Sequence, residues 1–198
     1  MTTSRAHDLW ASVRGNEHVL RAIEVSLVAD HSIMFIAPPG YGKSLFRAIM
    51  TGSSGARHTE LTPCLCGYYQ DLTQVCTCVP QQIGHWQAKL RKIAPAFDIT
   101  AYPSRPKFEE LFDTRREAFT TMWERVVVAR DRHIPKGIED GSSVGLLKAA
   151  YTKLNLSPGA AMRILRVSHS IACLDSACSQ IGAAHIAEAI QYRYRDDY

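Results

Sequence analysis

The pattern of apolar and polar positions divides the chain into two halves of different character. In the first half, residues 32–36 form an apolar run and residues 97–102 alternate and end at Pro103, so both segments predict strands. Residues 51–55, made of glycine, serine and threonine, predict a flexible break. This half is therefore expected to be an α/β domain. Its helices are predicted over residues 16–29, 45–50 and 80–93, and a proline begins the last of them.

The second half is predicted to be helical and to form a small bundle. Ser157 suits an N-cap and Pro158 suits the first position of a helix. Cys173 and Cys178 fall in and after one of these helices, where packing in the core is expected. Residues 103–106, with a proline at each end, are the expected domain boundary. The helices are predicted over residues 108–133, 142–155, 157–175 and 183–194.

A glycine-rich loop joins the first predicted strand to the helix that follows it. Residues 37–44 match the phosphate-loop pattern G-x-x-x-x-G-K-[ST], except that Ala37 replaces the first glycine, a mild change if residue 37 keeps ordinary backbone angles. In this pattern the glycines let N–H groups crowd around phosphate oxygens, Lys43 reaches the outer phosphates, and Ser44 can hold Mg²⁺. An ordinary glycine turn is the alternative. The candidate residues for binding ATP with Mg²⁺ are Pro39, Gly40, Tyr41, Gly42, Lys43, Ser44 and Leu45.

Four cysteines form two C-x-C pairs nine residues apart. Cys64 and Cys66 are the first pair, and Cys76 and Cys78 are the second. Four thiolates satisfy tetrahedral Zn²⁺, although C-x-C is tighter than the usual C-x₂-C, and His85 is a possible substitute ligand. Zn²⁺ is therefore a possible second cofactor. Buried or free thiols are the alternative, because a disulfide within C-x-C would be strained.

Composition narrows the class of protein. The chain has 198 residues, of which 46% are hydrophobic, enough to bury a core. The apolar runs are too short to cross a bilayer and the first residues lack an apolar signal segment, so a cytoplasmic protein with no membrane partner is expected. The net charge of +4 is small and does not by itself indicate nucleic acid as a partner.

Charged side chains of both signs interleave between residues 109 and 136. This mixture favours a solvated helix face with i,i+4 ion pairs, and a DNA-binding stripe is the alternative. The basic members are Arg115, Arg116, Arg125, Arg130, Arg132 and Lys136, and the acidic members are Glu109, Glu110, Asp113, Glu117, Glu124 and Asp131.

Several motifs in the same order resemble the magnesium-chelatase-like AAA+ ATPases, especially the ComM branch linked to DNA uptake and branch migration. The resemblance implies a nucleotide-binding protein with a reduced P-loop domain at residues 1–103, a cysteine-rich insert at 63–80, and a helical lid domain at 104–198. It also implies assembly into a ring. The motifs are VRGNEH at 13–18, the phosphate loop, PCLCGY at 63–68, CTCVPQQI at 76–83, RILRV at 163–167 and HIAEAIQYR at 185–193.

The chain differs from this family at the residues with which the family hydrolyses ATP. Only 18 residues separate Ser44 from Pro63, so the segment that carries the Walker B acidic pair is absent. The family's sensor asparagine, arginine finger and lid arginine correspond to Thr62, Ala96 and Gly159. The family's sheet has the strand order 5-1-4-3-2. Without strands 2 and 3, we expect three parallel strands, with residues 97–102 and about 58–62 on either side of 32–37.

Four functional interpretations remain open at this stage. The first is an ATP- or ADP-binding protein with little hydrolysis of its own. The second is an ATPase completed by carboxylates from elsewhere, such as Asp98, Glu60 or a neighbouring subunit in a ring. The third is a DNA-associated or scaffold protein that uses the cysteines and the charged helix. The fourth is a decaying fragment with no selected activity.

Overall fold

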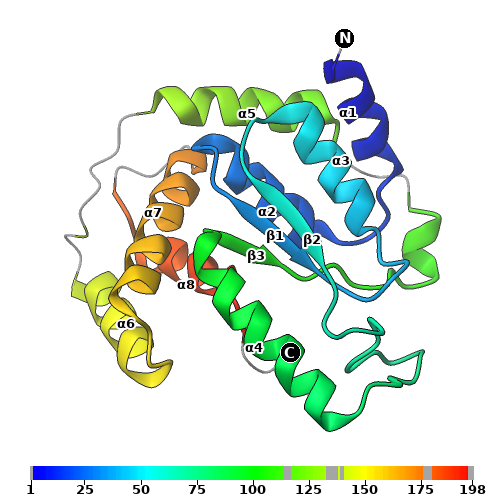
Figure 1. Ribbon diagram of the computed structural model, residues 1–198. Coiled ribbons are helices and arrows are strands. Elements are labelled where there is room, and N and C mark those ends of the chain that lie inside the picture. Colours follow the sequence, from blue (N-terminus) through cyan, green and yellow to red (C-terminus); the bar gives the residue numbers. More distant parts are fainter. Residues whose placement is uncertain (1, 114–116, 133–137, 139–140, 176–179, 196–198) are drawn as a thin grey trace.

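The computed structural model describes residues 2–113, 117–132, 138, 141–175 and 180–195, and its elements alternate at first between helices and strands (Figure 1). Cys178 lies outside the described residues. The elements are α1 (Thr2–Ser12), α2 (Glu17–Val28), β1 (Ile33–Ile36), α3 (Lys43–Ser53), β2 (His58–Leu61), α4 (Pro80–Ile93), η1 (Ala94–Ala96), β3 (Ile99–Ala101), η2 (Glu109–Leu111), α5 (Phe119–Asp131), α6 (Gly141–Lys153), α7 (Pro158–Leu174) and α8 (Ala183–Gln191).

The sheet has three parallel strands in the order β2-β1-β3, which confirms the predicted strand order. Ile33 of β1 is in register with His58 of β2 on one side and with Ile99 of β3 on the other. Every residue of β1 is buried, whereas β2 is half-buried along its length. A central strand covered on both faces explains why residues 32–36 read as a continuous apolar run.

Helices cover both faces of the sheet, and alternate residues of β1 point into two hydrophobic clusters. Ile33 and Phe35 belong to the larger cluster, which is built with α1, α2, α3, α5, α7 and α8. Met34 and Ile36 belong to a smaller cluster with Ala94, Phe97 and Tyr102. The structure is therefore an α/β core with a small parallel sheet and a helical C-terminal region, as predicted. The larger cluster takes residues from both sides of position 103.

The prediction of one long helix over residues 108–133 is wrong. Only the short 3₁₀ helix η2 and the later helix α5 form in the described part of this range. The carbonyl of Leu111 accepts a hydrogen bond from Arg14 at 3.2 Å, and that of Glu117 accepts one from Trp10 at 3.1 Å. These tertiary bonds use carbonyls that a continuous helix would need for itself.

Two smaller expectations also differ from the structure. Residues 51–53 of the expected flexible break continue α3, whose last turn packs against the sheet through buried Ile49 and Met50. Helix α1 was not predicted, although Ala6 and Trp10 are buried one turn apart on its inner face. No helix among the described residues has the length and the apolar character required to cross a membrane.

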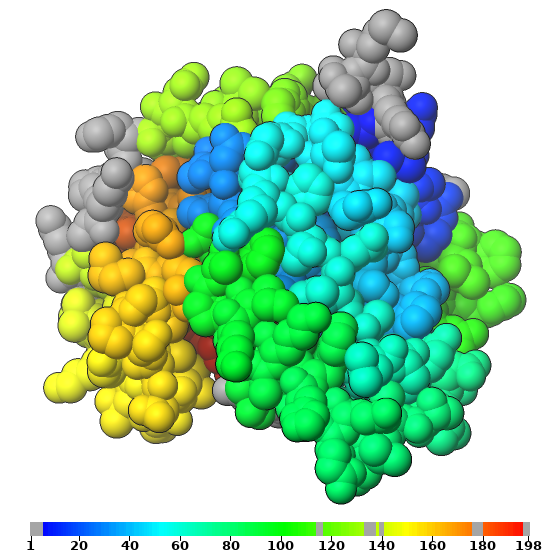
Figure 2. Space-filling view, viewed as in Figure 1, coloured from blue at the N-terminus to red at the C-terminus, as the bar shows by residue number. Residues whose placement is uncertain are grey.

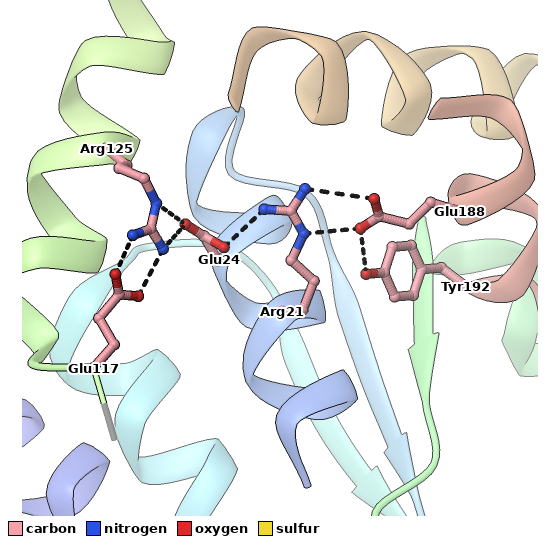
Figure 3. A network of polar contacts seen from close by, with 6 residues as sticks. All are labelled: Arg21, Glu24, Glu117, Arg125, Glu188 and Tyr192. Carbon is pink, nitrogen blue, oxygen red and sulfur yellow. Dashed lines mark hydrogen bonds and ion pairs between the residues drawn. The ribbon is translucent and has the colours of Figure 1, made fainter. Parts of the chain in front are cut away.

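A polar network joins α2 to α5 and α8 (Figure 3). Glu24 is 4% exposed and accepts hydrogen bonds from Nη2 of Arg125 at 2.7 Å and from Nη1 of Arg21 at 2.9 Å. Arg21 also donates to Glu188 on α8 at 2.9 Å. Removing either arginine would leave the buried carboxylate of Glu24 with one cationic partner instead of two, which is destabilising. The six side chains drawn are Arg21, Glu24, Glu117, Arg125, Glu188 and Tyr192.

The same contacts revise the interpretation of the charged segment. Arg125 pairs with α2 and with Glu117, and Arg130 donates to the carbonyl of Leu27 at 2.6 Å. Both arginines therefore make tertiary contacts rather than i,i+4 pairs along one helix face. Arg115, Arg116 and Lys136 lie outside the described residues.

Candidate functional site

The phosphate loop, residues 37–44, connects the carboxyl end of β1 to the first turn of α3 (Figure 1). Gly40 and Gly42 have φ angles of 83° and 82°, in the left-handed region that favours glycine. Ala37 is fully buried and is not among the residues with positive φ, so this position does not require the glycine of the usual pattern. Within the described residues, the N–H groups of residues 40–44 form no hydrogen bond to the protein. They remain available to an anion at the helix start.

Lys43 is folded into the loop. Its ammonium Nζ donates to the carbonyl oxygens of Ala37 at 2.6 Å and of Pro38 at 2.7 Å. Partial burial lowers the pKa of Lys43, and the nearby carboxylate of Glu60 opposes that shift. A phosphate group could exchange these neutral acceptors for charged ones, which form stronger hydrogen bonds.

Ser44 faces a carboxylate on the neighbouring strand. Its Oγ donates to Oε2 of Glu60, on β2, at 3.0 Å. The other carboxylate oxygen, Oε1, lies 3.4 Å from Nε of Arg47 on α3. Hydroxyl and carboxylate oxygens are the hard ligands that Mg²⁺ prefers, so this donor set fits the ion that accompanies a nucleotide.

The second candidate site lies in the cysteine loop, which is the chain between β2 and α4, residues 62–79. The Sγ atoms of Cys64, Cys66, Cys76 and Cys78 all lie within 4.8 Å of one another, and three of their separations are 3.4, 3.5 and 3.7 Å. Four sulfurs bound tetrahedrally at about 2.3 Å from zinc are about 3.8 Å apart, so the cluster could hold such an ion. His85 does not belong to this group.

Backbone N–H groups surround the sulfur atoms of the cluster. Gly67 and Tyr69 donate to Sγ of Cys64 at 3.2 and 3.3 Å. The pKa of Cys66 is lowered to about 5, chiefly because the N–H of Tyr68 points to its sulfur. Burial instead raises the pKa of Cys64. Thiolates are the form that binds metal, so N–H donors at these sulfurs suit a metal centre.

Two contacts join the cysteine loop to the phosphate loop. The hydroxyl of Tyr41 donates to the carboxylate of Asp71 at 2.5 Å, and this bond is the main reason that the pKa of Asp71 is lowered to about 2. Gly67 has a φ of 93°, and a Cβ at this position would lie 2.6 Å from Cδ of Pro39. Sequence reasoning did not find these contacts. The D-x-T run at Asp71, in which Thr73 N–H bonds back to the carboxylate at 2.8 Å, was the available signal for a turn there.

The three positions that depart from the family pattern carry no charge. The hydroxyl of Thr62 donates to the carbonyl of Cys64 at 2.8 Å. Ala96 ends η1 and is exposed, and Gly159 is the second residue of α7. None of them supplies a cationic group to the phosphate loop.

A cavity of about 470 Å³ in the described part of the chain is separate from the phosphate loop. It lies between the end of α4, β3 and the C-terminal helices, and none of its lining residues belongs to positions 37–45. The phosphate loop is thus a surface site rather than part of this cavity. The charged residues that line the cavity are Arg91, Asp98, Arg163, Arg193 and Arg195.

Two family models match the chain, one at each end. The model described as magnesium chelatase, subunit ChlI, matches residues 8–54, which include the phosphate loop. The model described as magnesium chelatase, subunit ChlI C-terminal, matches residues 138–193, which include α6, α7 and α8. No curated protein matches the sequence. Because two parts of one subunit match in order, the comparisons support a magnesium-chelatase-like family for this chain.

Proposed function

We propose that the chain binds ATP or ADP with Mg²⁺ at the phosphate loop and hydrolyses ATP only weakly on its own. The observation that carries the proposal is the loop itself. Its two glycines adopt positive φ, its N–H groups at residues 40–44 have no acceptor among the described residues, and α3 begins at Lys43. An anion cradle at a helix start is the geometry that nucleotide phosphates require.

Each residue of the cradle has an expected role. Gly40, Tyr41 and Gly42 supply backbone N–H groups next to Pro39, which has none, Lys43 turns from its carbonyl partners to the outer phosphates, and Ser44 binds Mg²⁺. Leu45 continues the helix whose dipole faces the phosphates. The bound ion would neutralise phosphate charge and hold the outer phosphates in place.

We expect weak hydrolysis because three positions at which the resembling family has catalytic side chains are occupied by residues of a different kind in this chain. Thr62, Ala96 and Gly159 cannot act as arginine finger or charged sensor, and an arginine finger alone is worth roughly 10³ to 10⁵ in rate. The placement in the ComM branch and the ring-shaped assembly remain predictions, and a ring could complete the site in trans. Turnover that appears only when a full-length homologue is added would support completion by a neighbouring subunit.

A second proposal concerns the four cysteines. We propose that Cys64, Cys66, Cys76 and Cys78 bind one Zn²⁺ ion that supports the cysteine loop. The separations of their sulfurs and the N–H groups around them favour this proposal over free thiols. Zinc here would have a structural role, because all four positions of a tetrahedral ion would be taken by protein sulfur.

Calorimetric titration with ADP and ATP, alongside phosphate release, tests the nucleotide proposal. We expect binding that Lys43→Ala weakens by roughly a hundredfold, because the ammonium makes charge-assisted bonds to phosphate. Lys148→Ala, an exposed lysine on α6, is the matched control and should bind normally. Absence of binding would overturn the proposal, and rapid turnover that depends on Lys43 would overturn its second half.

A further inference from the structure

Glu60 is the acidic side chain that the fold brings to the hydroxyl of Ser44. It lies on β2, one residue before the strand ends, in register with Phe35 of β1. Because β1 and β2 are parallel, their carboxyl ends meet at the edge of the sheet from which the phosphate loop leaves. There Oε2 of Glu60 accepts a hydrogen bond from Ser44 at 3.0 Å.

Asp98, the other carboxylate considered from the sequence, is at the opposite end of the sheet. It precedes β3 and accepts a hydrogen bond from the hydroxyl of Ser32 at 2.9 Å, just before β1 begins. Arg166 on α7 also donates to it at 2.6 Å. Asp98 therefore joins the amino ends of the strands to the C-terminal helices and does not face the phosphates.

The contacts of Glu60 leave it able to bind a cation. Its partner Arg47 is 54% exposed at the side chain, and exposed ion pairs of this kind contribute little to stability. Its second contact is the hydroxyl of Ser44, the group that holds Mg²⁺ in phosphate loops. A divalent ion between these two oxygens would replace a neutral hydrogen bond with two hard ligands.

We infer that Glu60 supplies the second protein ligand of the nucleotide's Mg²⁺ ion, in the role that a Walker B aspartate has in other P-loop proteins. The inference rests on the proposed nucleotide binding at Ser44. It also gives β2, the half-buried edge strand, a function: its position next to β1 brings a carboxylate to the loop without the missing strands. One carboxylate ligand supports metal binding but does not by itself supply the group that orients water.

The test compares ADP affinity in Mg²⁺ with ADP affinity in EDTA, because ADP binding requires no hydrolysis. In the unmodified chain Mg²⁺ should tighten ADP binding about tenfold, and Glu60→Gln should reduce this effect to less than about twofold while affinity in EDTA stays unchanged. Mn²⁺ bound to the protein–ADP complex, measured by electron paramagnetic resonance, should weaken in parallel because Mn²⁺ accepts the same oxygen ligands.

Three further variants separate this role from a structural one. Glu124→Gln, on the exposed face of α5, and Asp98→Asn should both keep the full Mg²⁺ effect. Arg47→Ala breaks the ion pair and should also keep it, whereas a purely structural pair predicts the same loss as Glu60→Gln. An unchanged Mg²⁺ effect in Glu60→Gln would overturn the inference alone. Failure of the unmodified chain to bind ADP in either buffer would overturn the proposed function itself.

Discussion

The phosphate loop and the cysteine loop lie next to each other but differ in how they hold their shape. The phosphate loop is fixed between a fully buried strand and a helix. The cysteine loop contains no helix or strand, and Leu72 and Val75 in it are 99% and 87% exposed. In Figure 2 this segment lies at the rim of the molecule beside α4. The shape of the phosphate loop is therefore fixed by the surrounding fold. The shape of the cysteine loop depends instead on its four sulfur atoms and on a ligand that they could bind.

This difference means that the two candidate ligands have different consequences for the fold. A nucleotide would add stability to a loop that is already formed. A zinc ion would supply most of the energy that orders its loop, as in small zinc domains, because little apolar surface is buried there. Through the contacts Tyr41–Asp71 and Gly67–Pro39, loss of order in the cysteine loop would then change the conformation of the phosphate loop.

The largest predicted effect is that of zinc removal. Structural zinc sites contribute roughly 10 kcal/mol or more, so a strong chelator, or Cys64→Ser with Cys76→Ser, should open residues 62–79 to hydrogen exchange and proteolysis. The sheet and its helices should keep their protection. Exchange measured by mass spectrometry checks this. Equal loss of protection in β1 would show that the sheet depends on zinc as much as the cysteine loop does, which would contradict this prediction.

A second prediction concerns the close approach of the two loops. Gly67→Ala places a Cβ 2.6 Å from Pro39 at a φ of 93°, and we expect a destabilisation of about 1–3 kcal/mol together with weaker ADP binding. Gly84→Ala, inside α4 with no atom within 4 Å of its added Cβ, is the matched control and should stabilise by about 0.5–1 kcal/mol. Chemical denaturation measures both. Normal ADP affinity in Gly67→Ala would show that the loops act independently.

Part of the fold and of the candidate site could be predicted from the sequence. The phosphate loop, its strand and α4 follow from local patterns, since glycine, proline and apolar spacing act over a few residues. The contact between Ser44 and Glu60 depends on the strand order, and periodicity does not reveal that order. The carbonyls of Leu111 and Glu117 accept hydrogen bonds from Arg14 and Trp10, about a hundred residues away in the chain, and the helix predicted over residues 108–133 does not form as one. No local pattern contains those donors.

Removing the hydroxyl of Tyr41 should have a smaller effect. Tyr41→Phe deletes the hydrogen bond to Asp71, whose carboxylate lies close to solvent, so the loss of stability should be small. We expect a slightly less stable cysteine loop and a change in ADP affinity of about threefold or less. Tyr151→Phe, on a half-exposed position of α6, is a suitable control. A loss as large as that of Lys43→Ala would mean that Tyr41 itself contacts the nucleotide.

The smallest predicted effect is a dependence of core stability on pH. His31, before β1, is 7% exposed and its Nε2 lies 2.7 Å from the hydroxyl of Ser170 on α7. Burial lowers the pKa of His31, so the unfolded chain binds more protons and the free energy of unfolding falls as the pH decreases below about 6.5. His31→Gln should reduce this dependence in thermal melts of zinc-free protein. An unchanged slope would show that the acid sensitivity comes from groups other than His31.

The most direct test of the account is native mass spectrometry of the purified chain after incubation with ADP, Mg²⁺ and Zn²⁺. We expect one zinc and one nucleotide for each chain. We also expect that Lys43→Ala loses only the nucleotide, and that the double cysteine variant loses the zinc and binds nucleotide more weakly. A chain that retains neither ligand would contradict both sites. A Lys43→Ala variant with full nucleotide occupancy would contradict the central claim that the phosphate loop is where the nucleotide binds.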